Sequence, residues 1–183
     1  MILAIILSVL AVGFLFIVSI FNQLVSLREN VKNGWSQIDV QLKRRHDLIP
    51  NLVETAKGYM AHEKDTLERV IKARQMAVDA STVKDKLQAE NILTSTLRSL
   101  MAVAENYPNL KADVQMMRLQ EELTSTENKI TFARQYYNDE ANCLNVAIQT
   151  FPDSIIASAA HFEKAAFFQV DDASERQAPN VKF

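Results

Sequence analysis

The chain contains few residues that interrupt helices and almost no cysteine. Its 183 residues include 3 glycines, 4 prolines and 1 cysteine. The soluble part is rich in Ala, Leu, Glu, Lys, Gln and Met, so it is predicted to be mostly helical. The single cysteine, Cys143, has no second thiol for an internal disulfide, and we interpret it as a small buried apolar residue.

Neither sign of charge is in excess along the chain. The formal net charge is −2, and Lys and Arg alternate with Asp and Glu throughout the sequence. A protein that binds nucleic acid needs a basic face that neutralises phosphates, and no such face is predicted here. We therefore expect no nucleic-acid partner.

Charge is absent altogether from residues 1–27, since Arg28 is the first ionisable side chain. The run MILAIILSVLAVGFLFIVSI supplies the roughly 20 apolar residues that span a hydrocarbon core of about 30 Å. A cleaved secretory signal is the alternative, but it requires a basic residue before the apolar stretch and an Ala-x-Ala cleavage pattern. Nothing basic precedes Ile2, and residues 21–23 lack that pattern. Residues 1–21 are therefore predicted to be an uncleaved membrane anchor, with lipid as its partner.

The orientation of this anchor is predicted from the basic residues that flank it. Only the α-amino group lies on one side, whereas Arg28, Lys32 and the cluster 43–45 follow on the other. The positive-inside rule then places the N-terminus outside and the remaining domain in the cytoplasm.

The apolar pattern after the anchor predicts one long helix. Apolar residues recur at alternating steps of three and four, which is the seam of a helix that packs against others: Leu24, Leu27 or Arg28, Val31, Trp35, Ile38 and Leu42. One rod is expected from about residue 2 to about 46, or further. Gly34 within it predicts a close helix contact beside Trp35. Pro50 predicts a break or kink, unless Asp47 is the N-cap of a new helix with Pro50 in its first turn.

Three further long helices are expected, over about 51–80, about 85–106 and about 109–151. Thr82 or Asp85 caps the second of these and Asn109 the third, which carries a heptad pattern at Leu123, Ile130, Tyr137, Leu144 and Phe151. A brief helix is expected from Asp153 to about Lys164. The predicted fold is thus all-α: a transmembrane helix continuing into an antiparallel bundle of about four long helices. The predicted boundaries are 1–21 for the anchor, 22–170 for the bundle and 171–183 for an extended tail.

The sequence offers no recognisable catalytic or metal site. Di-iron bundles need Glu three residues before His, but Lys43, Tyr59 and Ser158 occupy those positions. The zinc-protease pattern fails after His62, and no glycine-rich loop cradles phosphates. No serine is placed with a base and an acid in a way that suggests a nucleophile. We predict no enzymatic activity and no cofactor.

Polar residues in unusual positions are the candidates for function. They lie around Pro50 and on the last long helix: Asp39, Arg44, Arg45, His46, Asp47, Glu127, Asn128 and Arg134. Two interpretations stay open, a buried network that fixes helix register or a contact surface for a partner or a second copy. Trp35 is interpreted as part of the core rather than of a membrane belt, because it lies about 20 Å beyond the span at helical rise.

Five segments together resemble the LemA family of bacterial membrane-anchored helical proteins. The most specific is WSQIDVQLKRRHDLIPNLV at 35–53. The others are AENYP at 104–108, TENKI at 126–130, FARQYYN at 132–138 and APNVKF at 178–183. Gly34 departs from the alanine expected before the tryptophan.

The resemblance implies one N-terminal span, a long-helix bundle and a location in the bacterial inner membrane. It supplies no reaction; one relative belongs to the machinery that builds magnetosome membranes, so the implied role is organisation at a membrane. We predict a non-enzymatic scaffold that self-associates. The alternative is an adaptor or regulator that docks onto a membrane enzyme such as a protease. A third option is that Phe167, Phe168 and the segment 181–183 dock onto a neighbouring chain, unless these aromatics cover their own bundle.

Overall fold

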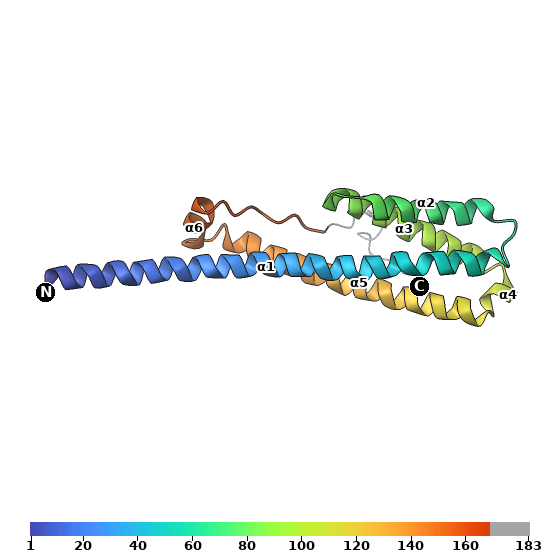
Figure 1. Ribbon diagram of the computed structural model, residues 1–183, viewed down its shortest axis with the longest axis horizontal. Coiled ribbons are helices and arrows are strands. Elements are labelled where there is room, and N and C mark those ends of the chain that lie inside the picture. Colours follow the sequence, from blue (N-terminus) through green and yellow to red (C-terminus); the bar gives the residue numbers. More distant parts are fainter. Residues whose placement is uncertain (169–183) are drawn as a thin grey trace, which may run out of the picture.

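The computed structural model describes residues 1–168, and it is all-α as predicted. Its described part contains four long helices and two short ones, and α1 extends far beyond the others at its N-terminal end (Figure 1). The tail predicted at 171–183 lies outside the described residues.

Helix α1 runs without interruption over Ile2–Lys57, so the predicted rod is confirmed and is longer than the sequence suggested. The break expected near Pro50 was wrong. Pro50 is exposed, and its missing N–H leaves the carbonyl of His46 without an intrahelical donor. Arg74 Nε donates to that carbonyl at 2.7 Å. A residue from the next helix therefore replaces the bond that proline removes.

The chain turns instead at residues 58–63, so α2 covers Lys64–Asp79 rather than beginning near residue 51. Tyr59 in this turn donates a hydrogen bond to Asp113 at 3.0 Å. Helix α3 covers Val83–Ala104, and the side chain of Thr82 caps it by accepting from the Asp85 N–H, as one of the two predicted caps.

After α3 the chain forms the short helix α4, Pro108–Lys111, and then α5, Val114–Ala147. Asp113 caps α5 by accepting from the Met116 N–H, so Asn109 was the wrong cap. Four members of the predicted heptad, Leu123, Ile130, Tyr137 and Leu144, are buried. Phe151, the expected fifth member, lies beyond the end of α5 and is exposed.

Helices α1 and α5 form a long antiparallel pair, and the α2–α3 hairpin lies against its distal half (Figure 1). The two helices α1 and α5 approach each other closely at Gly34. A Cβ added there would lie 3.1 Å from the Tyr137 Cα, which confirms the predicted close contact. Three apolar clusters follow one another along the bundle, with Leu52 and Leu100 in the distal one, Ile38 and Ile130 in the middle, and Ile20 and Leu24 nearest the N-terminal extension.

The last described elements are α6, Asp153–Ala159, and an extended strap that runs back along α5 to Phe168 (Figure 1). Two asparagines of α5 hold the strap by its backbone. Asn145 exchanges hydrogen bonds of 2.8 and 2.9 Å with Ala165, and Asn138 exchanges bonds of 2.7 and 3.0 Å with Phe168. Each amide side chain thus pairs with a backbone N–H and C=O, as a neighbouring strand would.

The N-terminal third of α1 has no covering element among the described residues. Every residue from Met1 to Ser19 is exposed, and the stretch is long and apolar enough to cross a membrane. The prediction for Cys143 was wrong: its side chain is exposed on the outer face of α5.

Candidate functional site

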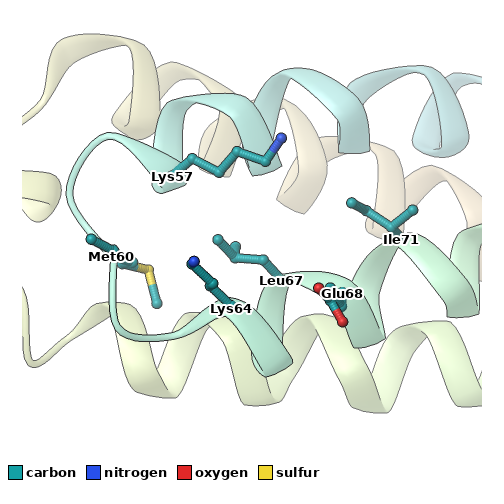
Figure 2. A pocket seen from close by; sticks show the side chains of 7 residues that line it. Lys57, Met60, Lys64, Leu67, Glu68 and Ile71 are labelled. Atoms are coloured by element: carbon teal, nitrogen blue, oxygen red, sulfur yellow. The ribbon is translucent and has the colours of Figure 1, made fainter.

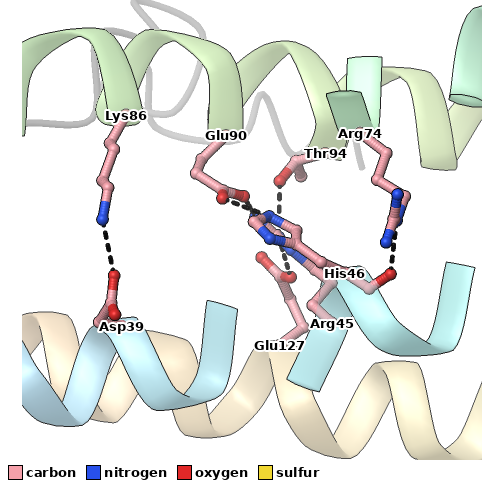
Figure 3. Close-up of polar contacts among 8 residues, drawn as sticks. All are labelled: Asp39, Arg45, His46, Arg74, Lys86, Glu90, Thr94 and Glu127. Carbon is pink, nitrogen blue, oxygen red and sulfur yellow. Dashed lines mark hydrogen bonds and ion pairs between the residues drawn. The ribbon is translucent and has the colours of Figure 1, made fainter. Parts of the chain in front are cut away.

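A buried ion network lies where α1, α3 and α5 meet (Figure 3). Arg45 of α1 and Glu90 of α3 pair with side chains that are each 1% exposed. The same guanidinium contacts Glu127 of α5 at 2.7 Å and donates to the Thr94 hydroxyl at 3.0 Å. One arginine therefore joins three helices by bonds of the charge-assisted kind, which are the stronger ones.

His46 completes the network on the side facing α2. Its Nε2 lies 2.7 Å from the second oxygen of Glu90, so both oxygens of that carboxylate have a partner. The backbone carbonyl of the same residue accepts from Arg74. Position 46 consequently links α1 to α2 through its backbone and to α3 through its side chain.

The environment of Glu90 favours its ionised form. Burial by itself raises the pKa of this carboxyl, but the hydrogen bond from His46 and the charges of Arg45 and His46 outweigh it. The net result is a pKa below its ordinary value. A buried carboxylate is stable only when paired and hydrogen-bonded in this way.

A groove of about 320 Å³ gives access to the outer edge of this network. It lies between α1 and the α2–α3 hairpin, and Lys86 and Asp39 pair across it at 2.7 Å. Its lining also includes His46, Asp47 and Arg74. The groove therefore presents charges of both signs and selects no simple ion.

The remaining predicted polar residues are spread over the surface. Arg44, next to the buried Arg45, pairs with Glu122 of α5 at 2.5 Å where both side chains are about half exposed. Asp47 is exposed at the rim of the groove, and Asn128 is exposed on α5. The structure thus brings Arg45, His46 and Glu127 together, with Asp39 and Asp47 along the adjoining groove. Arg44 and Asn128 lie elsewhere on the surface, and Arg134 is partly buried.

Trp35 lies in an aromatic cluster of the middle core, as expected for a core residue. Its ring is 5.7 Å from that of Tyr137 and 6.4 Å from that of Phe168. Arg134 places its guanidinium 4.3 Å from the Phe168 ring. Phe168 is buried on its own chain, so the option that this residue docks on a neighbour was wrong, whereas Phe167 is exposed and the segment 181–183 lies outside the described residues.

A second hollow, of about 380 Å³, lies at the distal tip of the bundle (Figure 2). Met60 and Leu67 supply an apolar floor, and Lys57 and Lys64 lie at its edge beside the turn between α1 and α2. Glu68 also lines the hollow, and Lys57 pairs with Glu54 at 3.1 Å, so the edge carries charge of both signs around an apolar floor.

The arrangement has few means for chemistry. No group of three or more His, Cys, Asp or Glu that could hold a metal occurs among residues 1–168. Each carboxylate of the buried network is engaged by Arg45 or His46, which leaves neither as a free base. A shift of these helices along their axes would separate Arg45 from Glu90 and Glu127, so fixing the helix register stays a prediction for this network.

Sequence reasoning missed the partners on α2 and α3: Arg74, Lys86, Glu90 and Thr94. A signal for one of them was present. Glu90 lies on the apolar stripe of α3 with Leu93, Leu97, Leu100 and Ala104, at the alternating spacing of a buried seam. A charge at a seam position indicates a buried partner, and Arg45 occupies the corresponding kind of position on α1 between Leu42 and Ile49.

Comparison with known proteins places these features in a family. The model of the LemA family matches residues 34–183. The chain is 24% identical over 167 residues to Protein LemA of Metamycoplasma hominis, covering 90% of this chain and 76% of that relative. It is 24% identical over 181 residues to Magnetosome protein MamQ 2 of Paramagnetospirillum magneticum. It is 23% identical to Magnetosome protein MamQ of Magnetospirillum gryphiswaldense.

The two magnetosome alignments each cover 85% of this chain but 66% of the relative, so the chain spans less than two thirds of the length of those proteins. The family match itself includes the Trp35 cluster, the buried network and the asparagines that hold the strap. The chain belongs to the LemA family.

Proposed function

We propose that this protein is a non-enzymatic, membrane-anchored helical scaffold that associates with further copies of itself. One observation carries the proposal: a single helix is wholly uncovered and apolar over Ile2–Ser19 and then forms the central seam of the bundle. Its uncovered length fits a bilayer core of about 30 Å. Because no hinge interrupts α1, the bundle is joined rigidly to the helix that we propose crosses the membrane.

The outer face of α5 is the surface proposed for self-association. Phe132, Tyr136, Cys143 and Val146 lie on one side of this helix by their spacing, and all are exposed, Phe132 by 71%. Two copies anchored in one membrane point the same way, so a two-fold axis along the membrane normal pairs each residue with its own counterpart. Cys143 then faces Cys143 of the second copy.

Oxidative cross-linking tests this pairing in native membranes. A disulfide requires Cα atoms within about 7 Å, so copper phenanthroline is expected to produce a covalent dimer through Cys143. The control replaces Cys143 by serine and places a cysteine at Lys72 on α2, which is also exposed. Equal yields from both positions would mean random collision and would contradict a specific α5 face.

A cysteine outside that face reports the orientation of the bundle, which we propose to be cytoplasmic in a bacterial inner membrane. Because Cys143 would lie between two copies, the label goes to Lys72→Cys in the Cys143→Ser background. A maleimide that cannot cross the membrane is expected to label it only after the cells are opened, because the positive residues from Arg28 onward are retained inside. Labelling in intact cells would place the bundle outside.

An adaptor for a membrane enzyme is the second candidate function, and the distal hollow favours it. Its apolar floor, with Lys57, Lys64 and Glu68 at the edge, suits a segment that inserts one apolar side chain and carries charged residues beside it. Affinity purification from native membranes, with the double variant K57E/K64E as the control, distinguishes the two functions. An enzyme recovered in fixed ratio with the unaltered chain and lost from the variant supports the adaptor. Self-assembly alone supports the scaffold.

A further inference from the structure

Helix α6 and the turn before it lie at the end of the bundle nearest the N-terminal extension (Figure 1), and this stretch is poor in charge. Between Ile148 and Ala160, Asp153 is the one charged side chain, in a chain of which 23% of residues are charged. Phe151 and Ile155 are 77% and 63% exposed there. Exposure of two large apolar side chains at adjoining positions of a turn and a short helix indicates an unpartnered contact surface.

This end of the bundle lies at a defined level on α1. Ala157 of α6 packs against Ile20 and Leu24, and the rings of Phe21 and Phe162 lie 6.1 Å apart. At 1.5 Å per residue, the helix from Ile2 to Ile20 is about 27 Å long. That length is close to the thickness of a hydrocarbon core, about 30 Å. Helix α6 is therefore attached to α1 where the helix leaves the hydrocarbon.

The position of Arg28, the first basic residue after the apolar stretch, agrees with this placement of the membrane boundary along α1. The Arg28 guanidinium lies 5.2 Å from the Phe162 ring, about two helical turns beyond Ile20. Arginines that follow a span commonly face the lipid headgroups, and phenylalanine favours the boundary between headgroups and acyl chains. The strap after α6 thus passes through the headgroup level, and the turn before α6 lies beside it.

We propose that the α5–α6 turn is a second membrane contact, in which Phe151 and Ile155 insert into the interfacial layer of the leaflet that α1 leaves. This inference rests on the proposed membrane anchor. The occupant is lipid rather than another protein, because α6 packs on α1 at Ile20 and Leu24, directly after the exposed apolar stretch that the bilayer itself covers. A second contact beside the span fixes the tilt and rotation of the rod, which a single helix leaves free.

A fluorescent probe at single cysteines tests the insertion in vesicles of phosphatidylethanolamine and phosphatidylglycerol. Cys143 is first replaced by serine, and nitrobenzoxadiazole is then attached in turn to F151C, I155C, L10C and V114C. Val114 is an exposed apolar residue at the distal end of the bundle and is the aqueous control. Leu10 lies within the span and reports the anchor itself.

At positions 151 and 155 we expect several-fold stronger quenching by a nitroxide near the top of the acyl chain than at position 114, together with protection from aqueous iodide. Equal iodide quenching at 151 and 114, with the Leu10 probe still quenched by a nitroxide deep in the acyl chain, would overturn the inference and leave the anchor intact. Protection from iodide without lipid quenching would mean that protein covers the turn, and would also overturn it. Loss of lipid quenching at Leu10 would overturn the anchor and the inference together.

Discussion

At the scale of single residues, Arg45 holds together the part of the bundle where α1, α3 and α5 meet. Its neighbours along the α1 seam, Leu42 and Ile49, are apolar and buried, so the guanidinium lies among side chains that cannot solvate it. Glu90 and Glu127 supply the opposite charges and Thr94 a further acceptor. A pairing of this kind adds little net stability compared with an apolar core, and we expect its role to be selection of one helix register.

Removing one member of this network is expected to be costly. Arg45→Ala leaves Glu90 buried without its main cation, and we expect the free energy of unfolding to fall by about 3–5 kcal/mol. Arg44→Ala is the matched control, because its exposed pair with Glu122 is worth less than about 1 kcal/mol. Urea unfolding of the full-length protein in mild detergent measures both. Similar losses in the two variants would contradict the account of the buried pair.

The same carboxylate makes stability depend on pH. Because the folded pKa of Glu90 lies below its ordinary value of 4.5, the unfolded chain binds more protons in the acid range. The contribution of Glu90 to the free energy of unfolding is therefore complete above about pH 4.5, and it is lost as the pH falls through the folded pKa. We expect the difference in urea midpoint between the unaltered protein and Glu90→Gln to narrow below pH 4.5. A difference that stays constant across this range would contradict the prediction.

At the scale of the helix, α1 continues through a proline because another element supplies the missing bond. Pro50 leaves the His46 carbonyl free, and Arg74 donates to it from α2. The local sequence therefore suggests a break, while the contact that prevents the break comes from a residue much later in the chain.

A double-mutant cycle tests this compensation. Arg74→Ala is expected to lower the free energy of unfolding by about 1.5–3 kcal/mol, the range for hydrogen bonds to charged groups. In a Pro50→Ala background the alanine N–H satisfies the same carbonyl, so Arg74→Ala should cost clearly less. Lys72→Ala, an exposed change on the same helix, is the control. Equal costs of Arg74→Ala in both backgrounds would show that the two positions are independent.

The approach of α1 to α5 gives a further prediction at this scale. An alanine at position 34 gains about 1 kcal/mol of helix propensity, but its Cβ must move the Tyr137 backbone by a few tenths of an ångström. We expect Gly34→Ala to change stability by less than about 1 kcal/mol, and Gly34→Leu to destabilise by about 1–3 kcal/mol through overpacking. Thermal unfolding of the two variants measures this. A leucine tolerated as well as alanine would contradict the close contact.

Many features of the helices could be predicted from the sequence, and most of the wrong predictions depend on contacts between residues far apart in the chain. The seams of α1 and α5 follow from periodicity, and Gly34 indicated its own close contact. The start of α2 and of α5 did not follow, since Arg74 prevents the break at Pro50 and Tyr59 supports the cap at Asp113. The partners of Arg45 lie on helices whose packing order the sequence alone does not specify. Cys143 was misjudged because composition says nothing of which face of a helix is covered.

At the scale of the whole molecule, the described chain is a rod with a bundle around its distal two thirds. The buried network, the Trp35 cluster and the strap each fix one level of this rod. In the proposed function such a molecule transmits position: the bilayer orients α1, and α1 orients the outward face of α5. Self-association through that face would then convert anchored monomers into an ordered array.

The scaffold proposal is tested most directly by the mass of the full-length protein in mild detergent. Light scattering measures this mass, with electron microscopy of the same sample. A version lacking residues 1–21 is measured beside it. We predict an assembly of several copies with a regular shape for the full-length chain, and a smaller species for the version without the span. A strictly monomeric mass for the full-length protein would contradict the scaffold.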